Sequence, residues 1–310
     1  MTITFIHNNK AFLPEVHAYA RLFGSLGINC QTALPQDVEK IDTDVEWHFI
    51  GLDTGKPKGR IKIHEYASGS IGPLRAFKNL SKKLLNVKPD FRLFLNPYVK
   101  KRFGFDDGIP FGYRDMGINT DWMAPTGSFP GSYQYDFVYI GDLSPARRPE
   151  GLLDVFTHTS LKDKTLLVIS SNYSHLQTKY RHYSNIIFKG PCEHSVIRSM
   201  LLEARYGINY IIDKEPFSRQ TSTKFLEYAA CGLPVISTQY TWIEEFSLKY
   251  GGQYFYLNNN MSNFTWEAVQ AFTFSPPDLS GWTWEKQIKA SGVLEFLDSK
   301  FTDSSVSLLF

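Results

Sequence analysis

The chain has 310 residues, 43% of them hydrophobic and 21% charged, which is ordinary for one large or two modest globular domains. A formal net charge of only +2 gives no bulk electrostatic reason to expect a nucleic-acid partner. No segment reaches the roughly 18 apolar residues that span a bilayer, and residues 1–20 lack the layout of a signal peptide.

The three cysteines, Cys30, Cys192 and Cys231, are scattered and show no metal-ligand spacing. We therefore expect reduced thiols in a cytoplasmic protein. Asp42 and Asp44 form an Asp-x-Asp pair that could hold Mg or Mn, but they lie in a predicted loop without supporting ligands. We interpret the pair as a turn and predict no metal site.

In the first part of the chain, strand-like apolar segments alternate with helical patterns, as in parallel α/β units. Helices are predicted over residues 14–26, ending at Gly27, and over residues 74–85. Residues 104–134 are rich in Gly, Pro, Asp and aromatic residues, so we expect loops leading to a linker. Strands are predicted at residues 3–7, 31–34, 47–51, 60–64 and 92–95.

A second α/β domain is predicted to open with a strand at residues 135–140. One helix is expected to run through residues 200–204, and another to end near Leu297. Further strands are predicted at residues 165–170, 186–189, 209–212, 235–237 and 254–257. We therefore expect two Rossmann-like halves facing a central cleft, with ligands at the carboxyl ends of the strands.

Residues 222–238 form the most informative segment of this second half. Thr221, Ser222 and Thr223 all offer hydroxyl caps for a helix, and Gly232 followed by Pro234 stops the helix before a strand begins at Val235. Amides at the helix N-terminus, together with an ammonium and a carboxylate on the first turns, suit a sugar nucleotide. The amides and the ammonium would meet the pyrophosphate, and the carboxylate would meet the ribose.

The pattern Lys224-x-x-Glu-Tyr-x-Ala-x-Gly-x-Pro-Val resembles the donor-site helix of the GT-B "group 1" glycosyltransferases, best known from family 4. Residues 137–156 and residues 185–190 resemble two further segments of the same donor domain, in the same order. The resemblance covers residues 136–240 and implies the GT-B fold. It implies an N-terminal acceptor-binding domain, residues 1–134, and a C-terminal donor-binding domain, residues 135–310, whose last helix can pack back on the N-terminal domain.

The resemblance also implies roles for residues of the second domain. Glu227 would contact the donor ribose, although it could equally form a local helix pair with Lys224. Arg147 would bind the diphosphate and act as the catalytic electrophile that stabilises the leaving group in place of a metal. The other donor-binding residues expected on this basis are Gly141, Arg148, Gly190, Ser222, Thr223 and Lys224.

Two positions depart from the family pattern. Many members carry a second glutamate eight residues before the first, where this chain has Arg219. Arg219, or the hydroxyls of Ser218 and residues 221–223, would then contact the donor sugar. Asp142 stands where members often have arginine. Because the second glutamate is missing, both retaining and inverting stereochemistry stay open.

In the first domain, His64 follows a predicted strand and would lie at its carboxyl end. It is predicted as a catalytic base towards the acceptor hydroxyl or as a contact to the donor sugar, with a buried structural histidine as the alternative. The loop after the first strand and the start of the following helix are predicted to bind the acceptor. Their residues are Asn8, Asn9, Lys10, Glu15 and His17.

Residues 73–103 contain nine lysine and arginine residues against one carboxylate, Asp90. Leu74, Phe77, Leu80, Leu84 and Leu85 give the predicted helix an apolar face with lysines around it. This pattern suits contact with an anionic membrane surface. A solvated helix whose apolar face packs into the core fits it as well.

The sequence thus predicts a cytoplasmic, metal-independent glycosyltransferase, peripheral on the inner face of the cytoplasmic membrane, without a cofactor. A nucleoside-diphosphate sugar would be the donor, and a lipid-linked glycan of O-antigen, capsule or exopolysaccharide synthesis the acceptor. One alternative is a nucleotide-sugar epimerase on the same fold. Another is a non-catalytic nucleotide-sugar-binding scaffold subunit.

Overall fold

The computed structural model describes residues 1–8, 13–49, 52–55, 60–68, 75–123 and 132–301. The chain divides into two compact units. The first unit consists of residues 1–117 and 281–310, and the second of residues 118–280. We describe each unit by itself; the predicted functional domains, residues 1–134 and 135–310, stay a prediction.

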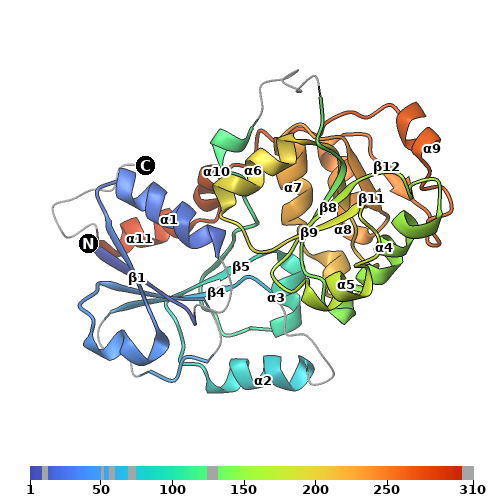
Figure 1. The fold of residues 1–310 in the computed structure, drawn as a ribbon. Coiled ribbons are helices and arrows are strands. Elements are labelled where there is room, and N and C mark those ends of the chain that lie inside the picture. Colours follow the sequence, from blue (N-terminus) through green and yellow to red (C-terminus); the bar gives the residue numbers. More distant parts are fainter. Residues whose placement is uncertain (9–12, 50–51, 56–59, 69–74, 124–131, 302–310) are drawn as a thin grey trace. The chain divides into compact units, whose positions relative to one another are not determined.

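The first unit is built on a parallel sheet of six strands in the order β2-β1-β3-β4-β5-β6 (Figure 1). Because the connections lie on both faces of a parallel sheet, each strand is covered on two sides. The strands are β1 (Thr2–Ile6), β2 (Asn29–Ala33), β3 (Val45–Phe49), β4 (Ile61–Tyr66), β5 (Phe91–Phe94) and β6 (Phe111–Tyr113).

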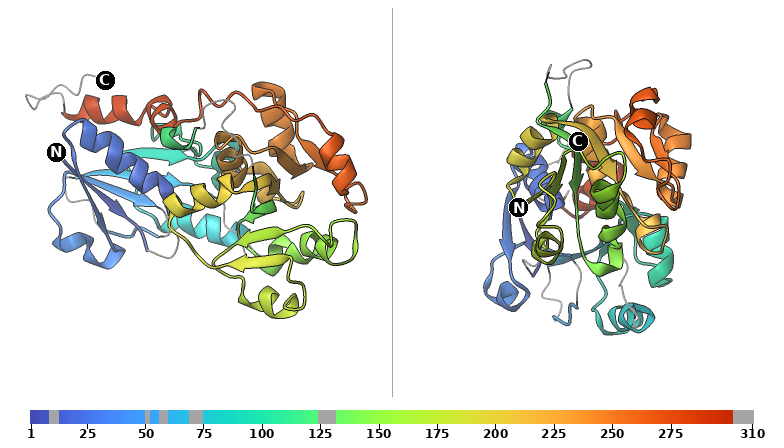
Figure 2. Two further views of the ribbon diagram at one scale, coloured as in Figure 1. Left: turned by 45° about the horizontal axis from the view of Figure 1, so that its top comes forward. Right: turned by 45° about the vertical axis from the view of Figure 1, so that its right-hand side comes forward.

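The two faces of this sheet differ in chemistry. One face is mostly apolar and packs against α1 (Pro14–Ser25), α10 (Trp284–Ala290) and α11 (Val293–Phe301), which lie side by side in Figures 1 and 2. The opposite face, towards α2 (Arg75–Leu85) and α3 (Pro97–Phe103), buries polar side chains of three strands: Glu46 and His48 of β3, Lys62 and His64 of β4, and Arg92 of β5. A short 3-10 helix, η1 (Pro35–Lys40), follows β2.

The C-terminal segment belongs to the core of the first unit. Ile288, Val293, Leu294 and Leu297 are at most 1% exposed and pack among the residues of β1, β3 and α1. The segment approaches β6 so closely that a Cβ atom at Gly112 would lie 1.8 Å from the carbonyl oxygen of Ser291. The end of the chain therefore completes the core that its beginning starts.

The second unit holds another parallel sheet of six strands, in the order β12-β11-β10-β7-β8-β9 (Figure 1). Counted from its first strand, this is the 3-2-1-4-5-6 order of dinucleotide-binding folds, and β7 and β10 flank the point where the order reverses. The strands are β7 (Tyr135–Ile140), β8 (Leu166–Ile169), β9 (Ile186–Lys189), β10 (Ala204–Asn209), β11 (Val235–Thr238) and β12 (Phe255–Leu257).

Helices connect these strands and enclose an apolar core that includes Phe137, Leu153, Val168, Ile208 and Ile236. The α-helices are α4 (Pro149–His158), α5 (Ser174–Lys179), α6 (His194–Leu202), α7 (Thr223–Ala230), α8 (Thr241–Tyr250) and α9 (Trp266–Ala271). The 3-10 helices are η2 (Thr120–Trp122), η3 (Pro145–Arg147) and η4 (Phe217–Arg219).

The predicted α/β class with two Rossmann-like halves is confirmed, and β7 and β9 have the predicted bounds. The strand predicted at residues 209–212 is wrong: the observed strand, β10, is Ala204–Asn209. It starts soon after α6, which ends at Leu202. In the sequence, Gly207 makes residues 204–209 resemble a turn between a helix and a strand. In the fold it lets the ring of Tyr228 approach, since a Cβ at Gly207 would lie 2.6 Å from Tyr228 Cγ. The edge strand β6 falls within residues 104–134, which were predicted as loops.

Candidate functional site

Three segments of the second unit meet where its strand order reverses. The loop after β7 begins at Gly141, whose φ of +147° favours glycine. A Cβ atom there would lie 3.3 Å from Lys224 Nζ on the first turn of α7. The same ammonium donates to the carbonyl oxygen of Tyr210, just after β10, at 3.1 Å and lies 4.2 Å from the ring centroid of Tyr139. Lys224 thus joins the carboxyl ends of β7 and β10.

The surroundings of Lys224 disfavour its charged form. Burial, together with the positive charge of Arg147, lowers the pKa of Lys224 to about 7, against the opposing effect of Asp142 and Glu227. A lysine at this pKa is partly protonated at neutral pH. It would be stabilised as a cation by an anion placed beside it.

Arg147 supplies the second cation of this site. Its guanidinium lies over the ring of Phe217, with Cζ 3.7 Å from the centroid, and Nε is 3.9 Å from Asp142 Oδ2. Burial lowers the pKa of Arg147, yet an arginine stays protonated in proteins. The long separation from Asp142 leaves this charge only weakly compensated.

Asp142 shapes the loop that carries Arg147. Its carboxylate accepts from the backbone amide of Ser144 at 3.0 Å and from Asn172 Nδ2 at 2.7 Å. Burial opposes ionisation of Asp142, but the bonds from Ser144 and Asn172 outweigh it, so its pKa lies below the ordinary value. Where members of the resembled family often have arginine, this chain therefore has a residue that orders the loop.

The start of α7 is held by a buried polar network. Ser222 caps the helix, its Oγ accepting from Phe225 N at 3.4 Å and donating to Asn209 Oδ1 at 2.8 Å. Asn209 in turn donates to Ser237 Oγ and to the hydroxyl of Tyr240, each at 2.9 Å. Of the three predicted cap candidates, Thr221, Ser222 and Thr223, the structure selects Ser222. Its hydroxyl is engaged with protein partners, whereas Thr223 beside it is exposed.

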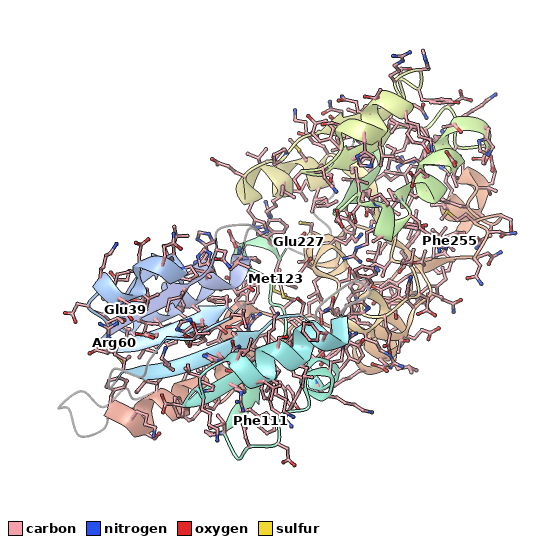
Figure 3. The ribbon with its side chains drawn as sticks, turned by 90° about the horizontal axis from the view of Figure 1, so that it is seen from below. Glu39, Arg60, Phe111, Met123, Glu227 and Phe255 are labelled. Carbon is pink, nitrogen blue, oxygen red and sulfur yellow. The ribbon has the colours of Figure 1, made fainter. Side chains whose placement is uncertain are left out.

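Glu227 lies one turn further along α7 (Figure 3). His194, the first residue of α6, lies with Nε2 3.1 Å from Glu227 Oε1, and its ring stacks on Trp122 with centroids 4.2 Å apart. With a carboxylate as acceptor, Nε2 is the protonated nitrogen. Glu227 is thus oriented by a residue from another helix, and both side chains remain partly exposed.

The remaining predicted residues of this half lie around the same elements. Arg219, at the end of η4, pairs with Glu245 at 3.4 Å and, more loosely, with Glu215 at 3.9 Å. Arg148 has a φ of +50° and accepts on its carbonyl oxygen from the hydroxyl of Tyr210. Gly190 follows β9, and a Cβ atom there would meet the ring of Tyr173 at 3.3 Å.

In the first unit, His64 is not at the carboxyl end of its strand. β4 continues through Tyr66, so the predicted end at His64 is wrong. The ring is completely buried, Nε2 lies 2.9 Å from Asp53 Oδ2, and Nδ1 has no hydrogen-bond partner in the described structure. Burial lowers the pKa of His64 to about 4, against the opposing effect of Asp53. The geometry is that of the alternative, a buried structural histidine.

The cluster around His64 combines opposite charges on the polar face of the sheet. Lys62 Nζ lies 2.7 Å from Glu46 Oε2 and 3.2 Å from Asp53 Oδ2. Arg60 reaches Glu46 Oε1 at 3.0 Å, and Figure 3 shows Arg60 near Glu39 of η1. Burial opposes ionisation of Glu46, but His48, Lys62 and Arg60 together lower its pKa to about 2.

The predicted acceptor-binding residues are differently placed. Asn8 and His17 are exposed, whereas Glu15 is 3% exposed with Oε1 3.6 Å from the guanidinium of Arg114. Arg114 also pairs with Glu65, which accepts from the hydroxyl of Tyr19 and from Trp47 Nε1. Asn9 and Lys10 lie outside the described residues.

Sequence reasoning missed several residues of the second-unit site: His194, Trp122, Tyr139, Tyr210 and Phe217. His194 had a weak signal, since it follows the matched strand at residues 186–189 and opens a helix. The others lie near Lys224, Arg147 or Glu227 only because the sheet brings distant segments together.

The described residues contain no group of three or more His, Cys, Asp or Glu side chains with metal-binding geometry. Asp44, of the Asp-x-Asp pair, accepts instead from the backbone amide of Thr2 at 2.7 Å. None of the described helices is long and apolar enough to cross a membrane.

Comparison with known proteins supports the predicted resemblance. Residues 134–265 match the family model described as glycosyl transferases group 1, which confirms the resemblance seen in the three motifs. No curated protein is matched by the sequence.

The fold is that of GT-B glycosyltransferases, as predicted. Sucrose-phosphate synthase from Thermosynechococcus elongatus superposes with a TM-score of 0.64 at 12% identity, over 98% of this chain and 100% of that one. HepE from Anabaena, solved with UDP and glucose, gives 0.59 at 12% identity, over 98% and 99%. A glycosyltransferase involved in avilamycin A biosynthesis gives 0.58 at 12% identity, over 99% and 98%.

Proposed function

We propose that this chain, which has the GT-B fold and matches the group 1 glycosyltransferases over residues 134–265, is a glycosyltransferase. It would transfer a sugar from a nucleoside-diphosphate sugar to a hydroxyl group of a glycan. The observation that carries the proposal is the convergence of Lys224, Arg147 and Gly141 where the strand order of the second sheet reverses. Ligands of open α/β sheets bind at such points.

The charge of this site matches a diphosphate. Lys224 and Arg147 are two neighbouring cations whose pKa values are both lowered, so an anion between them relieves desolvation and mutual repulsion. Gly141 allows the backbone to approach the phosphates closely. When the glycosidic bond breaks, negative charge grows on the departing nucleoside diphosphate. The two cations would stabilise that charge without having to reorganise.

Glu227 would accept hydrogen bonds from the ribose hydroxyls. His194 fixes one carboxylate oxygen at 3.1 Å, which orients the other towards a ligand. Arg219, exposed at the end of η4, stands where the family's second glutamate would be and would contact the donor sugar. Gly190, Arg148 and Thr223 complete the proposed donor-binding set.

We further propose that the acceptor is a lipid-linked glycan of bacterial surface polysaccharide synthesis, on the cytoplasmic side of the membrane. The exposed residues Asn8 and His17, with Asn9 and Lys10 of the same loop, would meet the acceptor. Glu15, buried against Arg114, would fix the start of α1, from which His17 is presented. The reaction would need no metal.

The test is ligand-observed NMR and calorimetry with a panel of nucleoside diphosphates and their sugars. We expect one nucleotide to bind selectively, and Lys224→Met and Glu227→Gln to weaken its binding at least about tenfold. Lys162→Met, an exposed lysine of the same unit, is the matched control and should bind like the wild type. A folded protein that binds no member of the panel would reject the proposal.

Turnover separates the transferase from the two alternatives. A sugar released from the donor only when an acceptor is present indicates a transferase. An isomerised donor without acceptor would identify an epimerase. Tight nucleotide-sugar binding without either product would identify a scaffold subunit, a role that the departures at Arg219 and Asp142 favour.

A further inference from the structure

Helix α2 presents its apolar side chains to solvent. Phe77, Leu80 and Leu84 are three, then four residues apart, so they share one face of the helix, and they are 68%, 51% and 70% exposed. Leu85 beside them is 57% exposed, whereas Asn79, on the other side, is 6% exposed. An ordinary surface helix buries its apolar face and exposes its polar one. In α2 this arrangement is reversed.

The polar side of α2 attaches the helix to the rest of the first unit. Lys83 Nζ donates to the carbonyl oxygen of Gly104, and Lys82 Nζ lies 5.8 Å from the ring centroid of Phe103 at the end of α3. These contacts hold α2 beside α3, on the side of the first sheet opposite α1 and α11 (Figure 1). The apolar face of α2 is therefore not part of the core. This rules out the interpretation of the sequence in which that face packs into the core.

The charges near this face identify what would cover it. Residues 73–103 carry nine cationic side chains against one carboxylate, and three of the nine, Lys100, Lys101 and Arg102, lie in the last turn of α3. An apolar stripe flanked by lysines is the composition of helices that lie in the headgroup region of anionic bilayers. A second copy of the chain would bring two equally cationic surfaces together, which Coulomb repulsion disfavours.

We propose that α2 is an interfacial membrane helix, which inserts Phe77, Leu80 and Leu84 into the headgroup region of an anionic phospholipid bilayer. Exposed lysines of the neighbouring segments, Lys88 and Lys101, would bind the lipid phosphates. The inference deepens the proposed function and rests on it for the acceptor, because a lipid-linked acceptor would be met at this surface. The membrane contact itself depends on α2 and on the cationic residues of this segment, and it needs no property of the nucleotide site.

The test is co-sedimentation with vesicles containing equal parts of phosphatidylglycerol and phosphatidylcholine. The double variant Phe77→Gln/Leu84→Gln keeps good helix formers in α2 and removes two apolar side chains. We expect its partition coefficient to fall at least about tenfold, because each inserted side chain contributes through its buried apolar area. Leu248→Gln, a leucine of α8 that is 89% exposed, is the control and should bind vesicles like the wild type.

Charge provides an independent arm of the same experiment. Vesicles of phosphatidylcholine alone, or added salt, should weaken binding of the wild type, since lipid attraction of lysines is screened. The proposal is overturned if the wild type ignores anionic vesicles or if the double variant binds them equally well. It is also overturned if the double variant instead abolishes self-association in ultracentrifugation. Retained nucleotide binding by the double variant separates this outcome from failure of the donor site.

Discussion

Lys224 carries an ammonium group that its surroundings hold close to deprotonation. Its Nζ has a carbonyl oxygen and an aromatic ring as neighbours, while Arg147 lies near enough to lower its pKa. The proposed ligand of this residue is a dianionic diphosphate. Binding and protonation of Lys224 should therefore be coupled.

We predict that donor binding takes up a proton at a pH well above 7. The free protein then holds Lys224 mostly neutral, since its pKa is about 7, and the diphosphate raises that pKa and stabilises the charged form. Well below pH 7 the lysine is already charged, so uptake disappears. Calorimetry of the sugar nucleotide in buffers of different ionisation enthalpy measures the proton number. Equal uptake in Lys224→Met would contradict the assignment.

A second titration concerns His64. The unfolded imidazole binds a proton near pH 6.5, whereas the buried one does so only near pH 4, because burial disfavours its charge. The unfolded state thus binds more protons between these values, so stability should fall as the pH is lowered through this window. The loss amounts to about 3 kcal/mol at most.

Urea unfolding of wild type and His64→Asn across this window tests the prediction. The variant should lose most of the pH dependence, although its stability at neutral pH is lower. Glu46 contributes mainly at lower pH, because its pKa is lowered from 4.5 to about 2. An unchanged slope in the variant would show that His64 titrates normally.

Among the helices and strands of the candidate site, α7 is held by specific contacts at both ends. Its N-terminus is fixed by the hydrogen bond between Ser222 and Asn209. Its C-terminus, at Ala230, is followed by Gly232, whose φ of +78° turns the chain away from the helix. The ring of Tyr228 lies against Gly207 of β10, and its hydroxyl accepts from the backbone amide of Ile140 at 2.8 Å. These contacts determine where Lys224 and Glu227 lie relative to the loop after β7.

Ser222→Ala should lower the free energy of unfolding by about 2–3 kcal/mol. The substitution removes the helix cap and leaves the buried amide of Asn209 without one partner. Thr223→Ala, at the exposed neighbouring position, should change stability by less than about 0.5 kcal/mol. Urea denaturation compares the two, and equal effects would show that the network contributes nothing beyond helix propensity.

For the molecule as a whole, the first unit is assembled from both ends of the chain. Residues 1–117 provide the sheet, but α10 and α11 from the C-terminal segment complete its apolar face. Trp284 packs against Gly117, where a Cβ atom would lie 2.6 Å from it. The stability of the first unit thus depends on residues that follow the whole second unit in the sequence.

Leu297→Ala should destabilise the first unit by about 2–4 kcal/mol, because the leucine is fully buried and its loss leaves a cavity. Amide hydrogen exchange should accelerate in β1, β3 and α1, and remain unchanged in β7 and β10. Leu248→Ala, at a position 89% exposed, serves as the control. Faster exchange in the second unit instead would contradict this division.

The sequence by itself determined the features whose causes are local. The strand at residues 135–140 was predicted at its observed bounds, because a short apolar run is bordered by loop residues. A hydroxyl cap within residues 221–223 and the stop at Gly232 were predicted likewise, since both depend on neighbouring backbone groups. The motif around Lys224 and Glu227 indicated the family that residues 134–265 match.

Only the tertiary structure decided the features that depend on distant partners. His194 lies beside Glu227 although 33 residues separate them, and the buried His64 is paired with Asp53, 11 residues earlier in the chain. Gly207 belongs to a strand because Tyr228 of another element fills the space beside it. The exposure of the apolar face of α2 also depends on how the helix packs on distant residues. Periodicity shows that a helix has an apolar side, but packing decides whether that side is buried.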